Sequence, residues 1–582
     1  MEISNQRLTK ILRNVAASYT IKKIGNIFQI RAYENAADSI EHSTSEIQDL
    51  WEEEKLNEVP GLGKGIQAYL DELFRTGKVE HFEQIQKGIP DIVFELLDIP
   101  GVGPKTAQKI AQMGINNLEQ LQIKIKTGAL IKKGLSAKIA QNIMSGIREV
   151  SSRTGRMLLP YASTHADKVI EYLKKSPDVI DLHSLGSLRR RVATIGDLDF
   201  AASSDQPQKV IEYFCKIPGV SRIVDKGEFK ATIMLKSGLH LDLLVGKPHS
   251  YGALLQHFTG GKNHNIHLRT LAAKQGFSLS EYGVKNIKTG KIVPTQTEEE
   301  FYKLLGMDTP EPEIREDTGE IEAALNHRLP NLVKIEDIKG DLHLHSNFPI
   351  ASPSHGPGAD SIEVMVNKAQ AIGYQFVGIS DHSPGHTSTK REAMISWVQK
   401  RTKFIQSLRK SKKSIRVLNG LEIDILGDGS LSVPDEALAA LDYCIAGIHS
   451  GHRGSRELIT KRLISALNNP HVDIISHPTN RLLNERESSD ADWEEVFKLA
   501  AKNNKILEIN AFPNRLDLRD DLVREAKKYG VKFTIDTDAH MMEQMDNMKF
   551  GVSVARRGWI TKEDIVNAWD WKKFSNWFKI RE

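Results

Sequence analysis

The sequence predicts a multidomain protein that combines α+β and α/β architecture. Its 582 residues are too many for one hydrophobic core, and a usual domain size of about 100–200 residues implies roughly three to five domains. Glycine turns between helical segments come first, and strands that carry aspartates come next. In the C-terminal part, strand-like runs that end in His, Glu or Asp alternate with helical patterns. These observations predict helical modules, a mixed sheet and a β/α barrel, in that order.

The composition is that of a globular protein. Hydrophobic residues make up 40% and charged residues 26% of the chain, and the formal net charge is +4, so any nucleic-acid-binding surface must be local. Cys215 and Cys444 stand alone in apolar runs, which indicates reduced core thiols instead of a disulfide framework or a zinc site. The N-terminus lacks a signal-peptide pattern, and no apolar run reaches about 18 residues. We therefore expect a soluble cytoplasmic protein without a membrane partner.

Two near-copies of one glycine pattern come after a helical region at residues 5–45. The copies occupy residues 59–66 and 99–107. In each, glycines allow a tight turn, and the next helix begins with unpaired N–H groups that can bind a DNA backbone phosphate without reading a base. This is the helix-hairpin-helix pattern. Any helix–helix turn favours one Gly-x-Gly, whereas two copies with adjacent lysines predict DNA contacts from Gly61, Gly63, Lys64, Gly101, Gly103 and Lys105.

The segment at residues 185–199 holds a Gly-Ser turn, three arginines and two aspartates. Asp197 and Asp199 alternate with apolar residues and therefore share one strand face, where paired carboxylates make an all-oxygen site that suits Mg2+. Gly186 and Ser187 offer N–H groups and a hydroxyl to a phosphate chain. An Asp-x-Asp pair alone is usually a solvated strand end, but this combination favours phosphoryl or nucleotidyl transfer.

A third carboxylate comes from a predicted hairpin at residues 231–245. Asp242 faces out of an otherwise apolar strand, and a lone aspartate there is costly to bury unless its charge is compensated. A metal ion shared with Asp197 and Asp199 would compensate it.

Beyond Asp242 the chain carries Phe258-Thr259-Gly260 and, at residues 281–283, Glu-Tyr-Gly. Together with Gly-Ser-x-Arg-Arg, Gly-Asp-x-Asp and the third aspartate, these motifs make residues 1–315 resemble the family X DNA polymerases, the family of DNA polymerase beta. The resemblance implies four domains. They are a helical domain with a helix-hairpin-helix at residues 1–85, a second helix-hairpin-helix domain at 86–150, a nucleotidyltransferase palm at 151–248 and a nucleotide-closing α/β domain at 249–315.

The same resemblance implies roles for individual residues. Asp197 and Asp199 would hold two Mg2+ ions, and Asp242 would complete the catalytic metal site. The incoming dNTP would contact Gly186, Ser187 and Arg190 through its triphosphate, His257, Phe258 and Gly260 through its sugar, and Asn265 through its base, with Arg269 near the template strand.

Two positions depart from the family. His257 replaces the usual tyrosine, which leaves discrimination against ribonucleotides open. Tyr69 stands where DNA polymerase beta has the lysine that forms a Schiff base, and Lys64 belongs to a phosphate-binding turn. We therefore expect little or no deoxyribose-phosphate lyase activity by that mechanism.

Residues 308–322 are acidic and rich in proline, as expected of a linker or of a tether packed on a basic surface, and we place the linker at residues 316–335. From residue 336 to 582 the character changes. Six strand-like runs end near chemically active residues, namely Asp341 to His345, Asp381 and His382, Glu422, His449, His477, and Asp536 to His540. A single histidine is more often a core or loop residue, but six such strand ends predict a β/α barrel that carries a multi-metal hydrolase site.

Residues 336–582 resemble the PHP (polymerase and histidinol phosphatase) family, which in bacterial family X polymerases is associated with Mn2+-dependent 3′–5′ exonuclease activity. The resemblance implies a distorted barrel with two to three Mn2+ or Zn2+ ions and with Glu422 as a bridging ligand. The implied ligands are His343, His345, His382, Glu422, His449, His477, Asp538 and His540. The family's aspartate after the His-x-His pair is missing, and His355 is the residue that could replace it.

We conclude from the sequence that the chain is a monomeric DNA polymerase that fills short gaps in a process like base excision repair. It would act on gapped or primer-template DNA and carry a 3′–5′ exonuclease. Two alternatives remain: the C-terminal domain is a non-catalytic scaffold, or the first half transfers nucleotides to another acceptor. Metal content would test the first alternative and template dependence the second.

Overall fold

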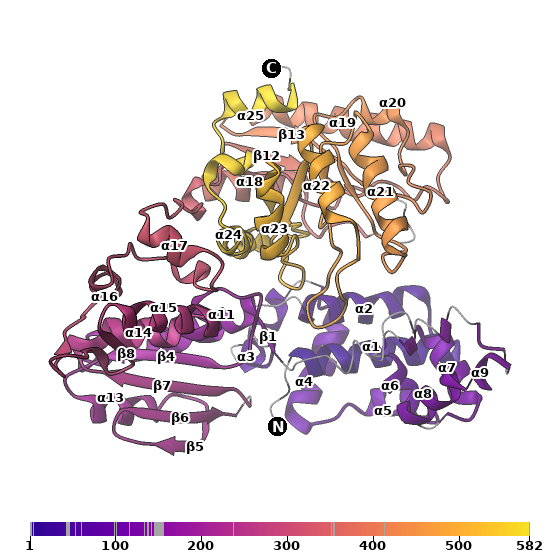
Figure 1. Cartoon of the computed structure of the whole chain (residues 1–582). Coiled ribbons are helices and arrows are strands. Elements are labelled where there is room, and N and C mark those ends of the chain that lie inside the picture. The colour runs from indigo at the N-terminus through magenta and orange to yellow at the C-terminus, as the bar shows by residue number, and fades with distance from the viewer. Residues whose placement is uncertain are drawn as a thin grey trace.

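The computed structural model describes residues 3–580, apart from residues 4, 42–46, 53, 60, 98, 100, 101, 116, 128, 133, 137, 138, 141, 142, 145–155, 237, 351, 353–355 and 413. The C-terminal domain lies above two other parts, the N-terminal helices and the region that carries the palm sheet (Figure 1). No helix within these ranges is long and apolar enough to cross a membrane. Cys444 is buried, Cys215 is half-buried, and both are free thiols, as the sequence predicts.

The N-terminal helices pack around two apolar cores. The first core collects side chains such as Leu12, Tyr33 and Leu70. It lies among α1 (Asn5–Lys22), α2 (Ile27–Glu41), α3 (Ile47–Glu52), η1 (Leu56–Glu58), α4 (Lys64–Thr76) and α5 (Glu80–Gln86). The second core contains Val93, Ile110 and their neighbours. It lies among α6 (Asp91–Leu97), α7 (Pro104–Gln112), α8 (Leu118–Lys126) and α9 (Ala129–Lys132).

The region that the sequence predicts as a palm, called the palm below, is built on a sheet with the strand order β2-β4-β7-β6-β5. Its elements are β1 (Met157–Leu158), α11 (Leu159–Leu173), β2 (Asp181–Ser184), α12 (Gly186–Arg189), β3 (Thr194–Ile195), β4 (Leu198–Ser203), α13 (Pro207–Phe214), β5 (Val220–Lys226), β6 (Lys230–Leu235) and β7 (His240–Gly246). Strands β6 and β7 form the hairpin that the sequence predicts. Strand β4 pairs with β7 in parallel, and this register places Asp199 opposite Asp242.

The next region packs on the palm through α14 (Tyr251–Thr259), which comes after η2 (Pro248–Ser250). The Tyr251 hydroxyl donates to the Ala201 carbonyl of β4 at 2.8 Å, and Leu254 and Leu255 share a buried cluster with Leu185. The region continues with α15 (Lys262–Lys274), β8 (Phe277–Ser280), β9 (Gly283–Asn286), β10 (Ile292–Val293) and α16 (Glu298–Leu304).

The acidic segment at residues 308–322 is ordered and packs against basic side chains. It forms η3 (Pro312–Ile314) and the start of α17 (Glu320–Leu325). Glu313 pairs with Arg556 at 2.7 Å, and Glu316 pairs with Arg190 at 2.9 Å. Of the two expectations for this segment, the packed tether therefore describes it.

The C-terminal domain is a ring of parallel strands covered by helices. Sheet β11-β12-β13 and sheet β14-β15-β16-β17-β18 are joined by parallel bridges from His382 to Glu422 and from Leu344 to Ala539. The strands are β11 (Gly340–Asp341), β12 (Phe376–Ile379), β13 (Arg416–Asn419), β14 (Glu422–Asp424), β15 (Ile445–Gly447), β16 (Ile474–Ile475), β17 (Ile506–Asn510) and β18 (Lys532–Asp536). This arrangement is the distorted β/α barrel that the alternating pattern predicts.

Helices surround this ring in chain order. They are α18 (Ile362–Ile372), α19 (Arg391–Ser411), α20 (Asp435–Leu438), α21 (Arg456–Asn468), α22 (Trp493–Lys502), α23 (Asp520–Lys528), α24 (Met548–Arg557) and α25 (Trp571–Phe578). Short 3-10 turns accompany them at η4 (Ile335–Asp337), η5 (Met542–Asn547), η6 (Lys562–Asp564) and η7 (Val566–Ala568).

A buried carboxylate joins the palm to α16 and to the acidic segment. Glu298 accepts two hydrogen bonds from Arg189, at 3.0 and 2.6 Å, and another from Arg315. Burial alone would raise the pKa of Glu298, but Arg315 and Arg189 lower it from 4.5 to about 2. The carboxylate is therefore charged at neutral pH and holds two guanidinium groups from different regions.

We expect Glu298→Gln to destabilise this junction by about 3 kcal/mol, because it leaves the buried guanidinium of Arg315 and the half-buried one of Arg189 without this counter-charge. Amide hydrogen exchange in α14 and α16 would measure the loss. The stabilisation from the ionised carboxylate is present above pH 4.5 and is lost as the pH falls through about 2. Exposed Glu299 provides the control, since Glu299→Gln should leave exchange unchanged. Equal protection in wild type and Glu298→Gln would contradict the prediction.

Candidate active sites

The palm aspartates come together at one edge of β4 and β7. Asp199 lies opposite Asp242 across the parallel pair, and Asp197 directly precedes β4. Burial raises the pKa of Asp199 to about 6, and the charges of Asp242 and Asp197 contribute to this rise. Such mutual repulsion marks an anionic cluster that a bound cation would relieve. Carboxylate oxygens are also the ligands that Mg2+ prefers, so these residues fit a magnesium site.

Asp242 is held in place by β6. Thr232 donates to its Oδ1 at 2.5 Å, and Lys230 Nζ lies 3.3 Å from the same oxygen. The lone carboxylate that the sequence marks in an apolar strand therefore has local partners on Oδ1. Among the described residues none hydrogen-bonds Oδ2, which can accept a ligand.

The Gly-Ser turn lies against the aspartates. Gly186 has a φ of +56°, and a Cβ there would lie 3.1 Å from Asp199 Oδ2, so the position requires glycine. Helix α12 starts at Gly186 and places Ser187 in its first turn beside the carboxylates. The sequence-predicted triphosphate contacts and metal ligands therefore lie side by side.

Arg189 and Arg190 turn toward the neighbouring region. Arg189 binds Glu298 and donates to Thr259 Oγ1 at 2.6 Å. Arg190 donates to the Thr259 carbonyl at 2.8 Å and to Glu316 at 2.9 Å. The arginine that the resemblance places on the triphosphate is thus already held by protein groups.

The predicted sugar and base contacts gather at the end of α14. The rings of His257 and Phe258 pack edge to face, with their centroids 4.8 Å apart. Burial, opposed by Glu281 and aided by Arg269, lowers the pKa of His257. A Cβ on Gly260 would lie 2.3 Å from Asn265 Oδ1. Asn265 itself donates to the His257 carbonyl at 2.8 Å and accepts from Gln256 at 2.8 Å, so in this structure its amide caps α14.

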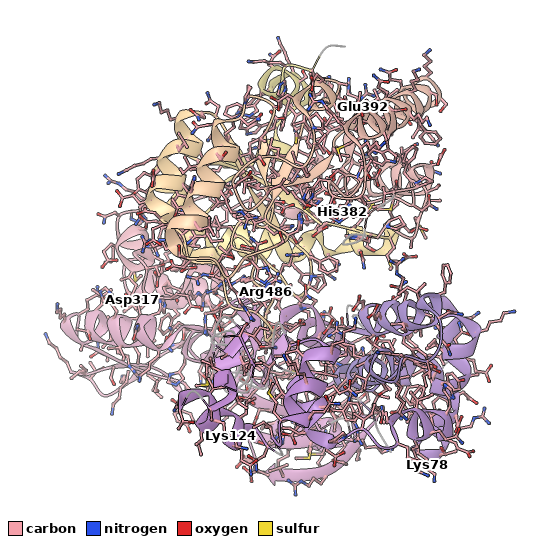
Figure 2. The ribbon with its side chains drawn as sticks, turned by 90° about the vertical axis from the view of Figure 1, so that its right-hand side faces the viewer. Lys78, Lys124, Asp317, His382, Glu392 and Arg486 are labelled. Atoms are coloured by element: carbon pink, nitrogen blue, oxygen red, sulfur yellow. The ribbon has the colours of Figure 1, made fainter. Side chains whose placement is uncertain are left out.

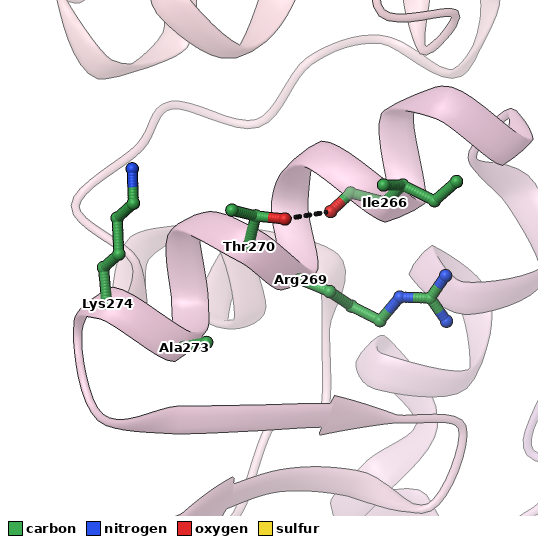
Figure 3. Close-up of a pocket in the computed structure, with 5 residues that line it drawn as sticks. All are labelled: Ile266, Arg269, Thr270, Ala273 and Lys274. Carbon is green, nitrogen blue, oxygen red and sulfur yellow. Dashed lines mark hydrogen bonds between the residues drawn. The ribbon is translucent and has the colours of Figure 1, made fainter.

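Arg269 lies on the exposed face of α15. Figure 3 shows it with Ile266, Thr270, Ala273 and Lys274 around a surface cavity of about 610 Å³. Thr270 donates to the Ile266 carbonyl at 2.9 Å, so its hydroxyl is used within the helix. The guanidinium of Arg269 extends from this face, where it can contact a nucleic-acid strand.

The two glycine turns place helix N-termini in open space. A Cβ on Gly63 or Gly103 would have no heavy atom within 4 Å, and Lys64 and Lys105 are exposed beside them. Gly61 serves another purpose, because its φ is +77° and a Cβ there would lie 2.4 Å from Ser39 Oγ. Gly101 lies outside the described residues. The second glycine of each pair therefore leaves room for a phosphate.

Tyr69 belongs to an aromatic cluster in the first helical domain. Its ring stacks on His81 with centroids 5.0 Å apart and on Tyr33 with centroids 6.5 Å apart. The position that holds an amine in DNA polymerase beta is therefore occupied by a packed ring.

The carboxylate of Glu422 lies at the centre of the C-terminal site. Its Oε2 lies 3.2 Å from His343 Nε2, 3.5 Å from His345 Nε2 and 3.0 Å from His382 Nδ1. Its Oε1 lies 3.2 Å from His449 Nε2 and 3.1 Å from His477 Nε2. The two oxygens therefore face different sets of imidazoles, as a bridging ligand requires.

Asp538 and His540 complete the cluster. Asp538 Oδ1 lies 3.1 Å from His345 Nε2, and the His540 ring stacks on His345 with centroids 4.2 Å apart. His345, His382 and His540 offer ligand atoms that lie within 4.8 Å of one another, as do His343, His345 and Asp538, and likewise His382, Glu422 and His449. All eight sequence-predicted ligands thus converge. His355 lies outside the described residues.

Two further carboxylates, which the sequence did not bring to notice, orient the histidines. Glu508 accepts from His343 Nδ1 at 2.6 Å, and Asp424 accepts from His449 Nδ1 at 2.7 Å. In both histidines Nε2 is left facing Glu422. Glu508 is fully buried inside the apolar strand β17, so the signal that marks Asp242 would also have found it.

The chemistry of this cluster fits a metal centre. Within the described part of the chain, His343 Nε2, His345 Nε2 and Glu422 Oε2 are buried without a hydrogen-bond partner. Burial, with His540 and His382, holds the pKa of His345 well below its ordinary value, so this imidazole is neutral. Burial opposes ionisation of Glu422, yet His343, His449 and His382 hold its pKa well below the ordinary value. A neutral imidazole and an ionised carboxylate are the forms that bind metals.

Backbone strain occurs at two of the predicted ligands. His477 has a φ of +27° and Asp538 a φ of +53°, a region that side chains other than glycine rarely adopt. Such conformations persist where the surrounding structure fixes them, and they concentrate at functional sites.

Arginines line one side of this cluster. Arg515 Nε lies 3.6 Å from Asp538 Oδ2, and Arg486 Nη1 lies 3.4 Å from His452 Nε2. Burial and, to a smaller extent, the charge of Arg515 lower the pKa of Arg486 to about 10. Burial and, to a smaller extent, the charges of Arg486 and Arg453 lower the pKa of His452 to about 4. Figure 2 shows Arg486 where the C-terminal domain approaches the rest of the chain, below His382. These neighbouring cations favour an anionic ligand.

Four family models match the chain. They are a helix-hairpin-helix domain at residues 3–79, a SAM-like helix-hairpin-helix tandem at 93–149, the DNA polymerase beta thumb at 254–316 and the PHP domain at 341–512.

Curated relatives cover nearly all of the chain or one part of it. The DNA polymerase/3′-5′ exonuclease PolX of Bacillus subtilis (strain 168) is 34% identical over 569 residues, which span 96% of this chain and 97% of the relative. DNA polymerase lambda of Rattus norvegicus is 25% identical over 347 residues, which span 54% of this chain and 56% of the relative. A protein of Thermoanaerobacter sp. (strain X514) named "Probable phosphatase" is 28% identical over 237 residues, which span 39% of this chain and 89% of the relative.

We expect Glu422→Gln to lower the Mn2+ affinity of the C-terminal cluster by at least about tenfold, because it removes the negative charge that faces five imidazoles at close range. Equilibrium dialysis followed by elemental analysis would measure bound Mn2+ per chain. Glu457→Gln, at the exposed start of α21, is the matched control. Equal Mn2+ binding by Glu422→Gln and wild type would contradict the assignment of a metal centre.

Proposed function

We propose that this chain fills short gaps during DNA repair as a DNA polymerase and is also a 3′–5′ exonuclease. The chain belongs to the PolX group of family X DNA polymerases, with helix-hairpin-helix, thumb and C-terminal PHP domains. One observation carries this proposal. The three palm aspartates and the eight C-terminal residues that the sequence predicts as ligands each form a cluster, in a chain that aligns over 96% of its length with a protein named for both activities. The division into the domains given above, and the role of each site residue, are part of the proposal.

At the first site, a primer 3′-hydroxyl would be joined to the α-phosphate of a dNTP, with pyrophosphate released. Asp197, Asp199 and Asp242 would hold Mg2+, which when bound stabilises the charge of the transferring phosphate. The N–H groups at the start of α12 and the Ser187 hydroxyl would bind the triphosphate. Arg190 would neutralise the phosphate charge with the guanidinium nitrogen that Glu316 and Thr259 leave free.

The substrate would be gapped or primer-template DNA. The open helix N-termini behind Gly63 and Gly103, each with an exposed lysine, support backbone phosphate contacts on both sides of a short gap. This pairing of turns disfavours transfer to a small-molecule acceptor. The packed ring of Tyr69 supports the absence of lyase chemistry at that position.

At the second site, water would hydrolyse the last phosphodiester bond at the 3′ end of a DNA strand. His343, His345, His382, Glu422, His449, His477, Asp538 and His540 would hold two to three ions of Mn2+ or Zn2+, which when bound polarise a phosphate and lower the pKa of water. Glu508 and Asp424 would keep two imidazoles oriented. Arg486 and Arg515 would bind the phosphate that leaves or the one behind it. The convergence of these eight residues argues against a scaffold without activity.

One assay on two variants separates the activities. The substrate is a 5′-phosphorylated single-nucleotide gap with a labelled primer, in Mn2+, with and without dNTPs. Asp199→Ala should abolish extension, by more than about 100-fold, and leave primer shortening intact. His449→Ala should abolish shortening and leave extension intact. Loss of both activities in Asp199→Ala would show that the two-site assignment is wrong.

The arginines at the second site should affect only shortening. We expect Arg486→Gln to slow primer shortening by about tenfold, the cost of one charge-assisted hydrogen bond, without changing extension. Arg391→Gln, which breaks an exposed pair with Glu436 near Glu392 and away from Arg486 (Figure 2), should change neither rate. Normal shortening by Arg486→Gln would remove this residue from the proposed phosphate contacts.

A further inference from the structure

One guanidinium of the C-terminal domain reaches the Gly-Ser-x-Arg-Arg turn of the palm. Arg557 is the last residue of α24, and its Nη1 donates to the Arg190 carbonyl at 2.9 Å. The same nitrogen lies 3.1 Å from Glu316 Oε1, the oxygen that accepts from Arg190 Nε at 2.9 Å. Arg557 therefore contacts both the backbone of Arg190 and the carboxylate that holds its side chain.

The other end of this contact is fixed inside the C-terminal domain. Arg557 Nε donates to Asp520 Oδ2 at 2.7 Å, and the Arg557 side chain is only 10% exposed. The groups thus form a continuous chain, Asp520–Arg557–Glu316–Arg190, in which charges alternate. Since guanidinium groups bind in a planar fork, each member restricts the orientation of the next.

Arg190 is held in a defined way by this chain. Its Nε donates a hydrogen bond to Glu316, and its Nη1 donates one to the Thr259 carbonyl. Among the described residues, its Nη2 has no protein hydrogen bond, and α12 places the residue next to the Gly-Ser turn. A guanidinium fixed through two nitrogens presents the third without loss of rotamer freedom when a phosphate binds.

We propose that Arg557 of the PHP domain is a positioning residue for Arg190, so that the docked C-terminal domain sets the affinity of the polymerase site for dNTP. This inference rests on the proposed polymerase function and deepens it. Arg557 acts through Glu316 and the Arg190 carbonyl and has no contact with the nucleotide itself.

The neighbouring residue provides a matched control. Arg556 also belongs to α24 and also crosses to the acidic segment, where it pairs with Glu313 at 2.7 Å and donates to the Val333 carbonyl at 3.2 Å. None of these groups contacts Arg190 in the described structure. Arg556→Gln therefore weakens domain docking in the same place and leaves the chain to Arg190 intact.

The experiment measures single-nucleotide gap filling by the full chain as a function of dNTP concentration. Arg557→Gln should raise KM for dNTP about tenfold, the effect of one charge-assisted hydrogen bond, with kcat changed less than KM. Arg556→Gln should leave KM within about twofold. Glu316→Gln, outside the PHP domain, should match Arg557→Gln, and the double variant should show no further increase, because the residues act in series. Primer shortening without dNTP should equal wild type in every variant, which confirms that the C-terminal domain is folded.

The results distinguish failure of the positioning role of Arg557 from failure of the proposed polymerase function. An unchanged KM in Arg557→Gln, or an equal rise in Arg556→Gln and Arg557→Gln, would overturn the positioning role while the polymerase assignment stands. No extension by the unmodified protein would overturn the proposed function and this inference with it.

Discussion

Carboxylates shared between two arginines hold the second half of the molecule to the palm. Glu298 lies between Arg189 and Arg315, and Glu316 lies between Arg190 and Arg557. In both cases the guanidinium groups come from different regions, so separating the regions would leave a partly buried charge without its partner. Both carboxylates also contact arginines of the same turn. The Gly-Ser-x-Arg-Arg turn is therefore the point on which palm, thumb and PHP domain converge.

The same requirement organises the barrel. Strand ends bring imidazoles from around the ring to one carboxylate, Glu422, whose two oxygens face five of them. Glu508 and Asp424 then fix the ring orientation of His343 and His449 from behind. Gly447 leaves the space for this crowding, because a Cβ there would lie 3.0 Å from His477 and 3.1 Å from His449. A metal ion would satisfy Glu422 Oε2 and the Nε2 atoms of His343 and His345, which are buried without a hydrogen bond among the described residues.

Features that repeat with a regular period or form a motif could be predicted from the sequence. Alternation of strands and helices predicts the barrel, and side chains at the strand ends predict its ligands, because parallel strands bring their C-terminal ends to one rim. Alternation and a Ser-Gly turn likewise predict the hairpin that carries Asp242. Glu508 was missed although it is a lone carboxylate in an apolar strand. The acidic composition of residues 308–322 marks the segment that contains Glu316 as a possible tether, but it does not name the partner. The contact between Arg557 and Glu316 spans 241 residues, and no local pattern distinguishes Arg557 from other arginines.

A second contact makes the domain arrangement definite. Asn484, two residues before Arg486, donates to the Arg156 carbonyl at 2.7 Å, just before β1 of the palm. The PHP domain thus meets the first half of the chain through the loop after β16 as well as through α24 (Figure 1). One contact would leave rotation about it free, whereas two contacts on different elements restrict that rotation. The loop that carries Arg486 is therefore fixed relative to the palm. An orientation fixed in this way allows a residue of one domain to set the geometry of the other domain's site.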